Sequence, residues 1–125
     1  MFGSSAGYEL PSGDTLAPDV SFLSRVRREV SGAGLDEFVP VAPDLAVEIL
    51  SPSSIARDRV EKRAIYATNG VREYWIVDPQ RRSIEIVPLA GDASGNTTVV
   101  SIGPVASRVL PGLELRAEEV FAEPV

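Results

Sequence analysis

The sequence predicts an α/β (α+β) domain in which helices flank a mixed β-sheet. Three observations carry this prediction. Residues 45–50 are a short apolar run, and residues 71–78 are dense in β-branched and aromatic side chains, as strands are. Residues 56–68, between these runs, are good helix formers. The alternation of apolar and polar side chains over residues 83–89 then indicates a half-exposed antiparallel strand.

The chain before these strands divides into two parts. Residues 1–16 are rich in Gly, Ser and polar side chains, and we expect a flexible N-terminal arm there. The folded domain is expected over residues 17–125. Its first predicted strand, residues 17–23, would place Asp19 and Val20 on opposite faces of the sheet.

The predicted helix over residues 56–68 has a weak apolar side. Val60, Ala64 and Ala67 form a narrow stripe that we expect to face the sheet. An Asn-Gly pair directly after the helix is a typical C-terminal stop.

Strand 71–78 is predicted to run through the core. Trp75 is expected to be buried, whereas Glu73 and Asp78 are interpreted as charged, solvated strand ends.

The C-terminal part predicts three short elements. Residues 98–102 favour a strand, and residues 117–121 a short terminal helix. Residues 108–115 are expected to be an extended segment at a sheet edge, because Pro111 cannot donate a hydrogen bond to a neighbouring strand.

The composition of the 125 residues excludes several kinds of site. The chain has no Cys and no His, so disulfides, thiolate or imidazole zinc sites and Ser-His-Asp catalysis are excluded. Any metal must be held by oxygen ligands, which indicates Mg²⁺ or Mn²⁺. The net charge of −6 argues against a strong general affinity for nucleic acid, but allows a local basic patch. We see no signal peptide or membrane span and expect a cytoplasmic protein.

Glu48 is the residue that most needs an explanation. It lies within the apolar strand 45–50, where a carboxylate needs a cation, a metal or a proton. Asp44 is four residues away, about 13 Å along the same strand, so the two cannot share one metal. Neighbouring strands are only about 4.8 Å apart, so Asp19 and Glu48 can meet if their strands pair. Asp44 either caps the strand entry or holds a second metal.

Lys62 is the second candidate, because the twelve basic residues are eleven arginines and this one lysine. From the helix that follows the Glu48 strand, it can fold back over the strand face and stabilise charge on a phosphate. The alternative is a surface pair with Asp58, four residues earlier. Tyr66, one helical turn after Lys62, either touches the site or packs in the core. Both alternatives stay open at this point.

Several segments together resemble one known family. They are Pro18-Asp19, the stretch from Pro43 to Ser53 with Glu48, Lys62, Tyr66, the stretch from Gly70 to Pro79, and Leu110-Pro-Gly-Leu113. Over residues 17–121 they look like the Uma-two family of restriction endonucleases, which belongs to the PD-(D/E)XK nuclease-like superfamily.

The resemblance implies a restriction-endonuclease-like mixed sheet flanked by helices, with Asp19 and Glu48 as metal ligands. Leu50 occupies the position where the motif has its lysine. The resemblance implies that Lys62, in the following helix, takes the role of that lysine. From the resemblance we also expect the chain to lack the family's usual N-terminal helix and strand.

Three functional hypotheses follow. The first is a Mg²⁺-dependent endonuclease that hydrolyses DNA, with Asp19, Glu48 and Lys62 as its catalytic residues. The second is a catalytically inactive nuclease-like domain that serves in binding or dimerisation. The negative charge and the late start favour it, and an exposed first strand suits a homodimer. The third is a structural domain in which Lys62 or an arginine neutralises Glu48.

Basic residues around Lys62 are candidates for contacts with a nucleic acid. Arg57, Arg59 and Arg63 could line a phosphate-binding face. The alternative is that arginines at this spacing form an ordinary solvated helix face.

Overall fold

A five-stranded mixed sheet forms the centre of the protein. The computed structural model describes residues 8–9, 12–13, 15–16, 18–31, 42–51, 56–89 and 97–122. The strands lie in the order β3-β4-β5-β6-β7, with β4 and β5 parallel and the other pairs antiparallel. Their bounds are Val20–Phe22 for β3, Leu45–Ile49 for β4, Glu73–Asp78 for β5, Ser83–Pro88 for β6 and Thr98–Val100 for β7. The predicted mixed α/β sheet is confirmed.

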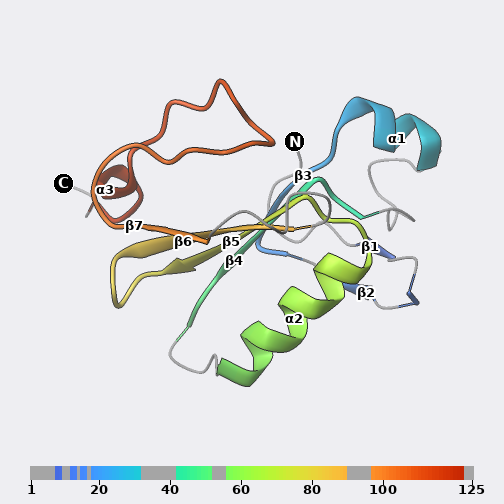
Figure 1. Ribbon diagram of the computed structural model, residues 1–125, viewed down its shortest axis with the longest axis horizontal. Helices are drawn as coiled ribbons and strands as arrows, with labels where there is room; N and C mark the ends of the chain where they lie inside the picture. Colours follow the sequence, from blue (N-terminus) through green and yellow to red (C-terminus); the bar gives the residue numbers. More distant parts are fainter. Residues whose placement is uncertain are drawn as a thin grey trace.

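Helix α2, Ala56–Thr68, covers one face of this sheet (Figure 1). The helix has the predicted bounds, but the predicted apolar stripe is not the side that faces the sheet. Ala64 and Ala67 are exposed, and the side chain of Val60 lies outside the described residues. Fully buried Tyr66 faces the sheet instead and packs on Tyr74 of β5, with ring centroids 5.3 Å apart.

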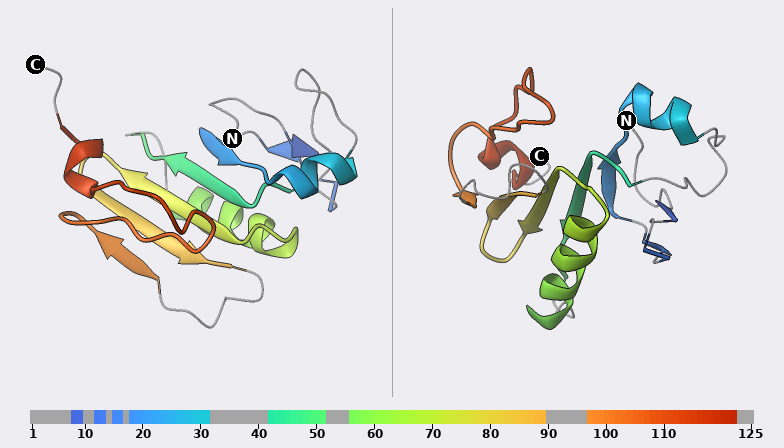
Figure 2. Two further views of the ribbon diagram at one scale, coloured as in Figure 1. Left: turned by 90° about the horizontal axis from the view of Figure 1, so that it is seen from above. Right: turned by 45° about the vertical axis from the view of Figure 1, so that its right-hand side comes forward.

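The C-terminal part of the chain covers the opposite face (Figure 2). Trp75 is buried there as predicted, and helix α3, Ala117–Val120, lies on this side of the sheet. The extended edge segment predicted over residues 108–115 is wrong: these described residues include no strand. A turn with a hydrogen bond of 3.0 Å from Leu113 N to Leu110 O bends the segment, and its leucines pack against the core.

Short elements surround the edge strand β3. Helix α1, Arg25–Ser31, follows β3 directly. β1, Tyr8–Glu9, and β2, Thr15–Leu16, form a separate antiparallel pair. They fall in the segment expected as an arm, so the boundary between residues 16 and 17 stays a prediction. A homodimer through β3 also stays a prediction.

None of the helices in the described segments is long and apolar enough to cross a membrane.

Candidate active site

Asp19 and Glu48 lie next to each other on neighbouring strands. β3 pairs with β4 so that Val20 is opposite Val47, and the next position along this register sets Asp19 opposite Glu48. Asp19 Oδ2 accepts a hydrogen bond of 2.7 Å from the backbone N–H of Ile49, the residue after Glu48. Since paired strands are about 4.8 Å apart, both carboxylates can reach one ligand. The structure thus brings together the two residues that strand spacing pairs.

Two side chains of α2 contact the Glu48 carboxylate. The Tyr66 hydroxyl donates a hydrogen bond of 2.8 Å to Oε1, and Lys62 Nζ lies 3.4 Å from Oε2. Lys62 and Tyr66 are one helical turn apart, so they share one side of α2. Tyr66 therefore both touches the site and packs in the core. Asp58, the alternative partner of Lys62, has its side chain outside the described residues.

Burial dominates the electrostatics of this cluster. Glu48 is only 7% exposed, and its loss of hydration raises the pKa of its carboxyl. The hydrogen bond from Tyr66 and the charge of Lys62 oppose this shift in pKa, whereas the charge of Asp19 adds to it. Burial, followed by the charge of Glu48, also raises the pKa of Tyr66, which keeps its hydroxyl a donor. A second cation beside Glu48 would therefore stabilise its charged form.

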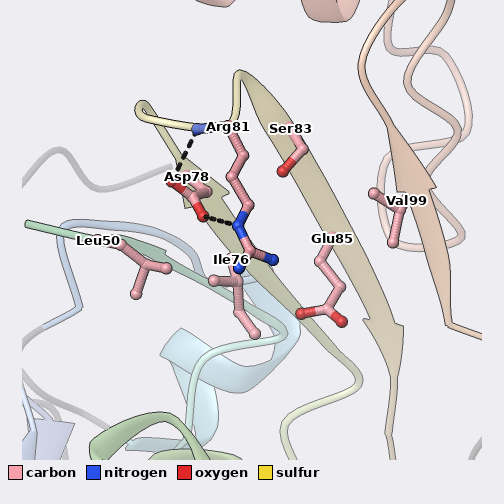
Figure 3. Close-up of a pocket in the computed structure, with 7 residues that line it drawn as sticks. All are labelled: Leu50, Ile76, Asp78, Arg81, Ser83, Glu85 and Val99. Carbon is pink, nitrogen blue, oxygen red and sulfur yellow. Dashed lines mark hydrogen bonds and ion pairs between the residues drawn. The ribbon is translucent and has the colours of Figure 1, made fainter. Parts of the chain in front are cut away.

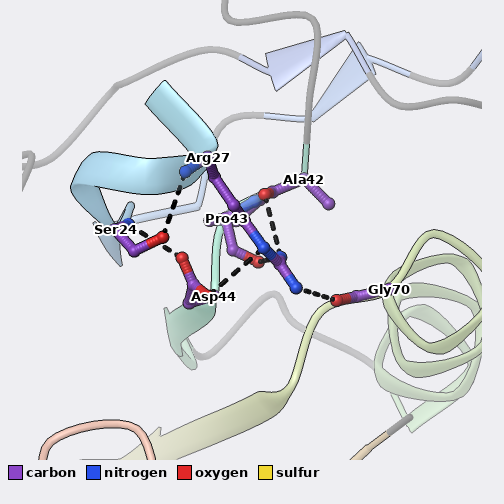
Figure 4. A network of polar contacts seen from close by, with 6 residues as sticks. All are labelled: Ser24, Arg27, Ala42, Pro43, Asp44 and Gly70. Carbon is purple, nitrogen blue, oxygen red and sulfur yellow. Dashed lines mark hydrogen bonds and ion pairs between the residues drawn. The ribbon is translucent and has the colours of Figure 1, made fainter. Parts of the chain in front are cut away.

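Asp44 belongs to a separate network at the start of β4 (Figure 4). Its Oδ2 accepts a hydrogen bond of 2.8 Å from the backbone N–H of Ser24, and its Oδ1 lies 3.3 Å from Arg27 Nε. The Arg27 guanidinium also donates to three backbone carbonyls, those of Ala42, Pro43 and Gly70. Both oxygens of Asp44 are thus engaged, which favours the structural interpretation over a second metal.

Comparison with protein families matches residues 1–118 to the Uma2 family, described as "Putative restriction endonuclease". The chain belongs to the Uma2 family. This confirms the resemblance seen in the sequence motifs. Among solved structures, the Uma2 chain is similar to a "putative nuclease belonging to DUF820" from Anabaena variabilis, at 19% identity and a TM-score of 0.72. No curated protein matches.

The structural match covers 87% of the Uma2 chain and 61% of the Anabaena chain. The chain thus spans about three fifths of the length of this relative. At this identity the likeness shows the fold, and it agrees with the mixed sheet described above.

The side chains of the Uma2 site fit a hard divalent cation. The described residues contain no cluster of three or more His, Cys, Asp or Glu side chains that could hold a metal. Mg²⁺, however, commonly uses one or two carboxylates and completes its shell with water and phosphate oxygens. Asp19 and Glu48 supply two carboxylates, and each oxygen has a second lone pair beyond the hydrogen bond it accepts.

The arginines predicted to contact phosphate are only partly described. Arg63 is exposed on α2, and the side chains of Arg57 and Arg59 lie outside the described residues. Their contacts with phosphate stay predictions.

Sequence reasoning missed the environment of Glu73. Interpreted as a solvated strand end, it is only 2% exposed and accepts hydrogen bonds from Trp75 Nε1 at 2.9 Å and Ser107 Oγ at 2.5 Å. The backbone N–H of Arg108 donates a third, of 3.1 Å. A signal was present: Trp75, two residues later and on the same face, needs an acceptor when it is buried.

A second missed residue, Glu85 of β6, lies on the same face as Glu48. Ile76 of β5 is opposite Glu48 on one side and opposite Glu85 on the other. Half-buried Glu85 belongs to the surface beside the candidate site. The alternation over residues 83–89 identifies Glu85 as a polar position, but it does not show which strand lies beside it.

Proposed function

We propose that this protein is a metal-dependent endonuclease that hydrolyses phosphodiester bonds of DNA. The family and fold support nuclease activity, and the observation that carries the proposal is the group formed by Asp19, Glu48 and Lys62. Three chain segments distant in the sequence bring two carboxylates and the chain's single lysine to one point. Two carboxylates beside one ammonium group suit the binding of a phosphate: the carboxylates can hold a divalent cation, and the cation and the ammonium group can contact the phosphate.

Asp19 and Glu48 would hold Mg²⁺ or Mn²⁺. When bound, such an ion supplies a Lewis acid for the phosphoryl oxygens and lowers the pKa of a water molecule. Lys62 contributes a positive charge 3.4 Å from Glu48, where it can donate a hydrogen bond to a phosphate oxygen as negative charge develops in the transition state. The Tyr66 hydroxyl fixes the orientation of Glu48 by holding Oε1.

Nicking of supercoiled plasmid DNA in Mg²⁺ tests the proposal. We expect wild type to nick the plasmid, and Glu48→Gln and Lys62→Ala each to lose activity by about a hundredfold or more. Glu114→Gln removes one negative charge at an exposed position and serves as the matched control, with wild-type activity. Nicking that persists in both site variants contradicts the assignment.

Calorimetric titration with Mn²⁺ separates the nuclease from an inactive relative of the same fold. We expect one binding event in wild type that disappears in Asp19→Asn and in Glu48→Gln. A wild-type chain that binds no Mn²⁺ cannot use the proposed site, and would favour the binding or dimerisation hypothesis.

A further inference from the structure

A hollow lies next to Glu48 on the face of the sheet that α2 partly covers. Its volume is about 90 Å³, and we call it the Glu85 hollow. It is lined by Leu50, Ile76, Asp78, Arg81, Ser83, Glu85 and Val99 (Figure 3).

The Glu85 hollow adjoins the candidate active site through the register of the sheet. Glu48 is opposite Ile76, Ile76 is opposite Glu85, and Glu85 is opposite Val99. Residues in one such row point to the same face. The backbone of Glu85 is two strand spacings from Glu48, or about 10 Å. A ligand chain bound at Glu48 can therefore continue into the hollow.

The hollow combines an apolar floor with a polar rim. Ile76 forms the floor and is 5% exposed, and Val99 is an apolar wall that is 62% exposed. The Glu85 carboxylate and the Ser83 side chain stand along β6 on one side (Figure 3). A flat ring with polar groups at its edge suits these surroundings, because apolar contact and a few placed acceptors are what small-ligand sites use.

Arg81 extends back over β5 from the turn between β5 and β6, and its guanidinium lies at the hollow (Figure 3). Its Nε is 3.8 Å from Asp78 Oδ2, and its side chain is 83% exposed. An exposed pair of this length contributes little stability, so Arg81 can turn to another anion. Asp78 remains bound to the turn, since its Oδ1 accepts the backbone N–H groups of Gln80 and Arg81 at 3.1 and 3.2 Å.

We propose that the Glu85 hollow binds a cytosine base of the DNA strand, next to the phosphodiester bond held at Asp19 and Glu48. This inference rests on the proposed function. Glu85 accepts a hydrogen bond from the exocyclic amino group of cytosine, which thymine lacks. Arg81 donates to the phosphate of the same nucleotide. The small volume favours a pyrimidine over a purine, and the base enters from a single strand or after leaving its stack.

Sequencing of cut ends tests this inference on DNA of random sequence incubated with the protein and Mg²⁺. We expect cytosine to be enriched at one fixed distance from the cut by wild type, on the order of tenfold over thymine. In Glu85→Gln, cutting continues but the preference collapses, because an amide both donates and accepts and so tolerates thymine. Glu114→Gln, the same change at an exposed position outside the hollow, should keep the preference.

Binding without catalysis gives an independent measurement. Fluorescence anisotropy in EDTA compares labelled oligodeoxycytidine and oligothymidine of equal length. Wild type should bind the cytidine oligomer more tightly, and Glu85→Gln should bind both alike. Arg81→Ala should weaken both equally, whereas Arg72→Ala, an exposed arginine outside the hollow, should weaken neither.

The outcomes distinguish this inference from the proposed function. Cutting with no base preference, or with a preference that survives in Glu85→Gln, overturns the cytosine site and leaves the nuclease proposal intact. If wild type neither cuts DNA nor binds Mn²⁺, the proposed function fails and the cytosine site fails with it.

Discussion

The Tyr66 hydroxyl donates a hydrogen bond of 2.8 Å to Oε1 of Glu48, between α2 and the sheet. Tyr66 is fully buried and Glu48 is 7% exposed, so water does not readily replace either partner. The bond joins the strand that carries a candidate metal ligand to the helix that carries Lys62. We therefore expect stability and metal binding to be linked at this one contact.

Tyr66→Phe tests that link, since it removes the donor and keeps the ring. We expect the free energy of unfolding to fall by about 1–3 kcal/mol, because hydrogen bonds to charged groups contribute that much. Urea denaturation measures the loss. Mn²⁺ affinity, measured by calorimetry, should fall as well, because Glu48 loses the contact that orients it.

A double-mutant cycle supplies the control for Tyr66. In a Glu48→Gln background the acceptor is neutral, so Tyr66→Phe should cost less than in wild type by about 0.5 kcal/mol or more. An equal cost in both backgrounds would show that the charge of the Glu48 carboxylate does not strengthen this hydrogen bond.

Arg27→Ala should be one of the most destabilising changes outside the core. The guanidinium of Arg27 binds Asp44, which is only 4% exposed, and three backbone carbonyls. Removing it leaves a buried carboxylate without its cation, and we expect a loss of about 2–4 kcal/mol in the free energy of unfolding. Arg25→Ala, at an exposed position two residues earlier on α1, is the matched control and should stay within about 0.5 kcal/mol of wild type. Equal losses in the two variants would contradict the role of this network.

Local patterns in the sequence were enough to predict the elements that build the site. β4 is an apolar run, β5 is dense in β-branched and aromatic residues, and α2 lies between a turn and an Asn-Gly stop, so their ranges follow from short-range chemistry. The pairing of Asp19 with Glu48 needed one further assumption, that their strands are neighbours, and strand spacing then excluded Asp44 as the partner.

The inner side of α2 could not be predicted from apolar residues because it is largely polar. Lys62, Tyr66 and Asn69 recur at helical spacing, and Asn69 is 9% exposed. The side-chain amide of Asn69 donates to Ile65 O at 2.7 Å, and its oxygen accepts from the backbone N–H of Ser12 at 2.7 Å. Ile65 lies on α2 itself, but Ser12 lies on a distant segment, and hydrophobic periodicity within the helix says nothing about that partner.

Glu73 shows a second limit, since strand position alone indicated a solvated end. The loop at residues 106–110 folds over it and supplies two donors, at Ser107 and Arg108. Such a contact joins residues about 35 positions apart, so it cannot be predicted from a local sequence pattern.

Glu73→Gln should destabilise the protein, although it preserves shape. A carboxylate accepts all three hydrogen bonds, whereas an amide turns one NH₂ group toward donors. We expect a loss of about 1–3 kcal/mol in the free energy of unfolding. The emission of Trp75, the single tryptophan, should shift to the red as its N–H loses its acceptor and the loop loosens. Glu114→Gln should change neither quantity, and an unshifted emission at wild-type stability would contradict the buried role of Glu73.

Glu118 on α3 should make the free energy of unfolding depend on pH in acidic solution. It accepts hydrogen bonds from the backbone N–H of Gly103 at 2.9 Å and from Arg116 Nε at 2.6 Å. The Gly103 bond is the largest cause that lowers the pKa of Glu118, from 4.5 to about 2. A lowered pKa means that the folded state favours the charged form. Its contribution is therefore complete above pH 4.5 and is lost as the pH falls through about 2.

Glu118→Gln removes this titration. Urea denaturation at pH 7 should show a lower stability for Glu118→Gln than for wild type, and the difference should shrink steadily as the pH falls from 4.5 toward 2. Glu114→Gln, four residues earlier and also exposed, should track wild type throughout. A difference that is the same at pH 7 and near pH 2 would mean that the carboxylate's charge does not hold α3 to the loop at Gly103.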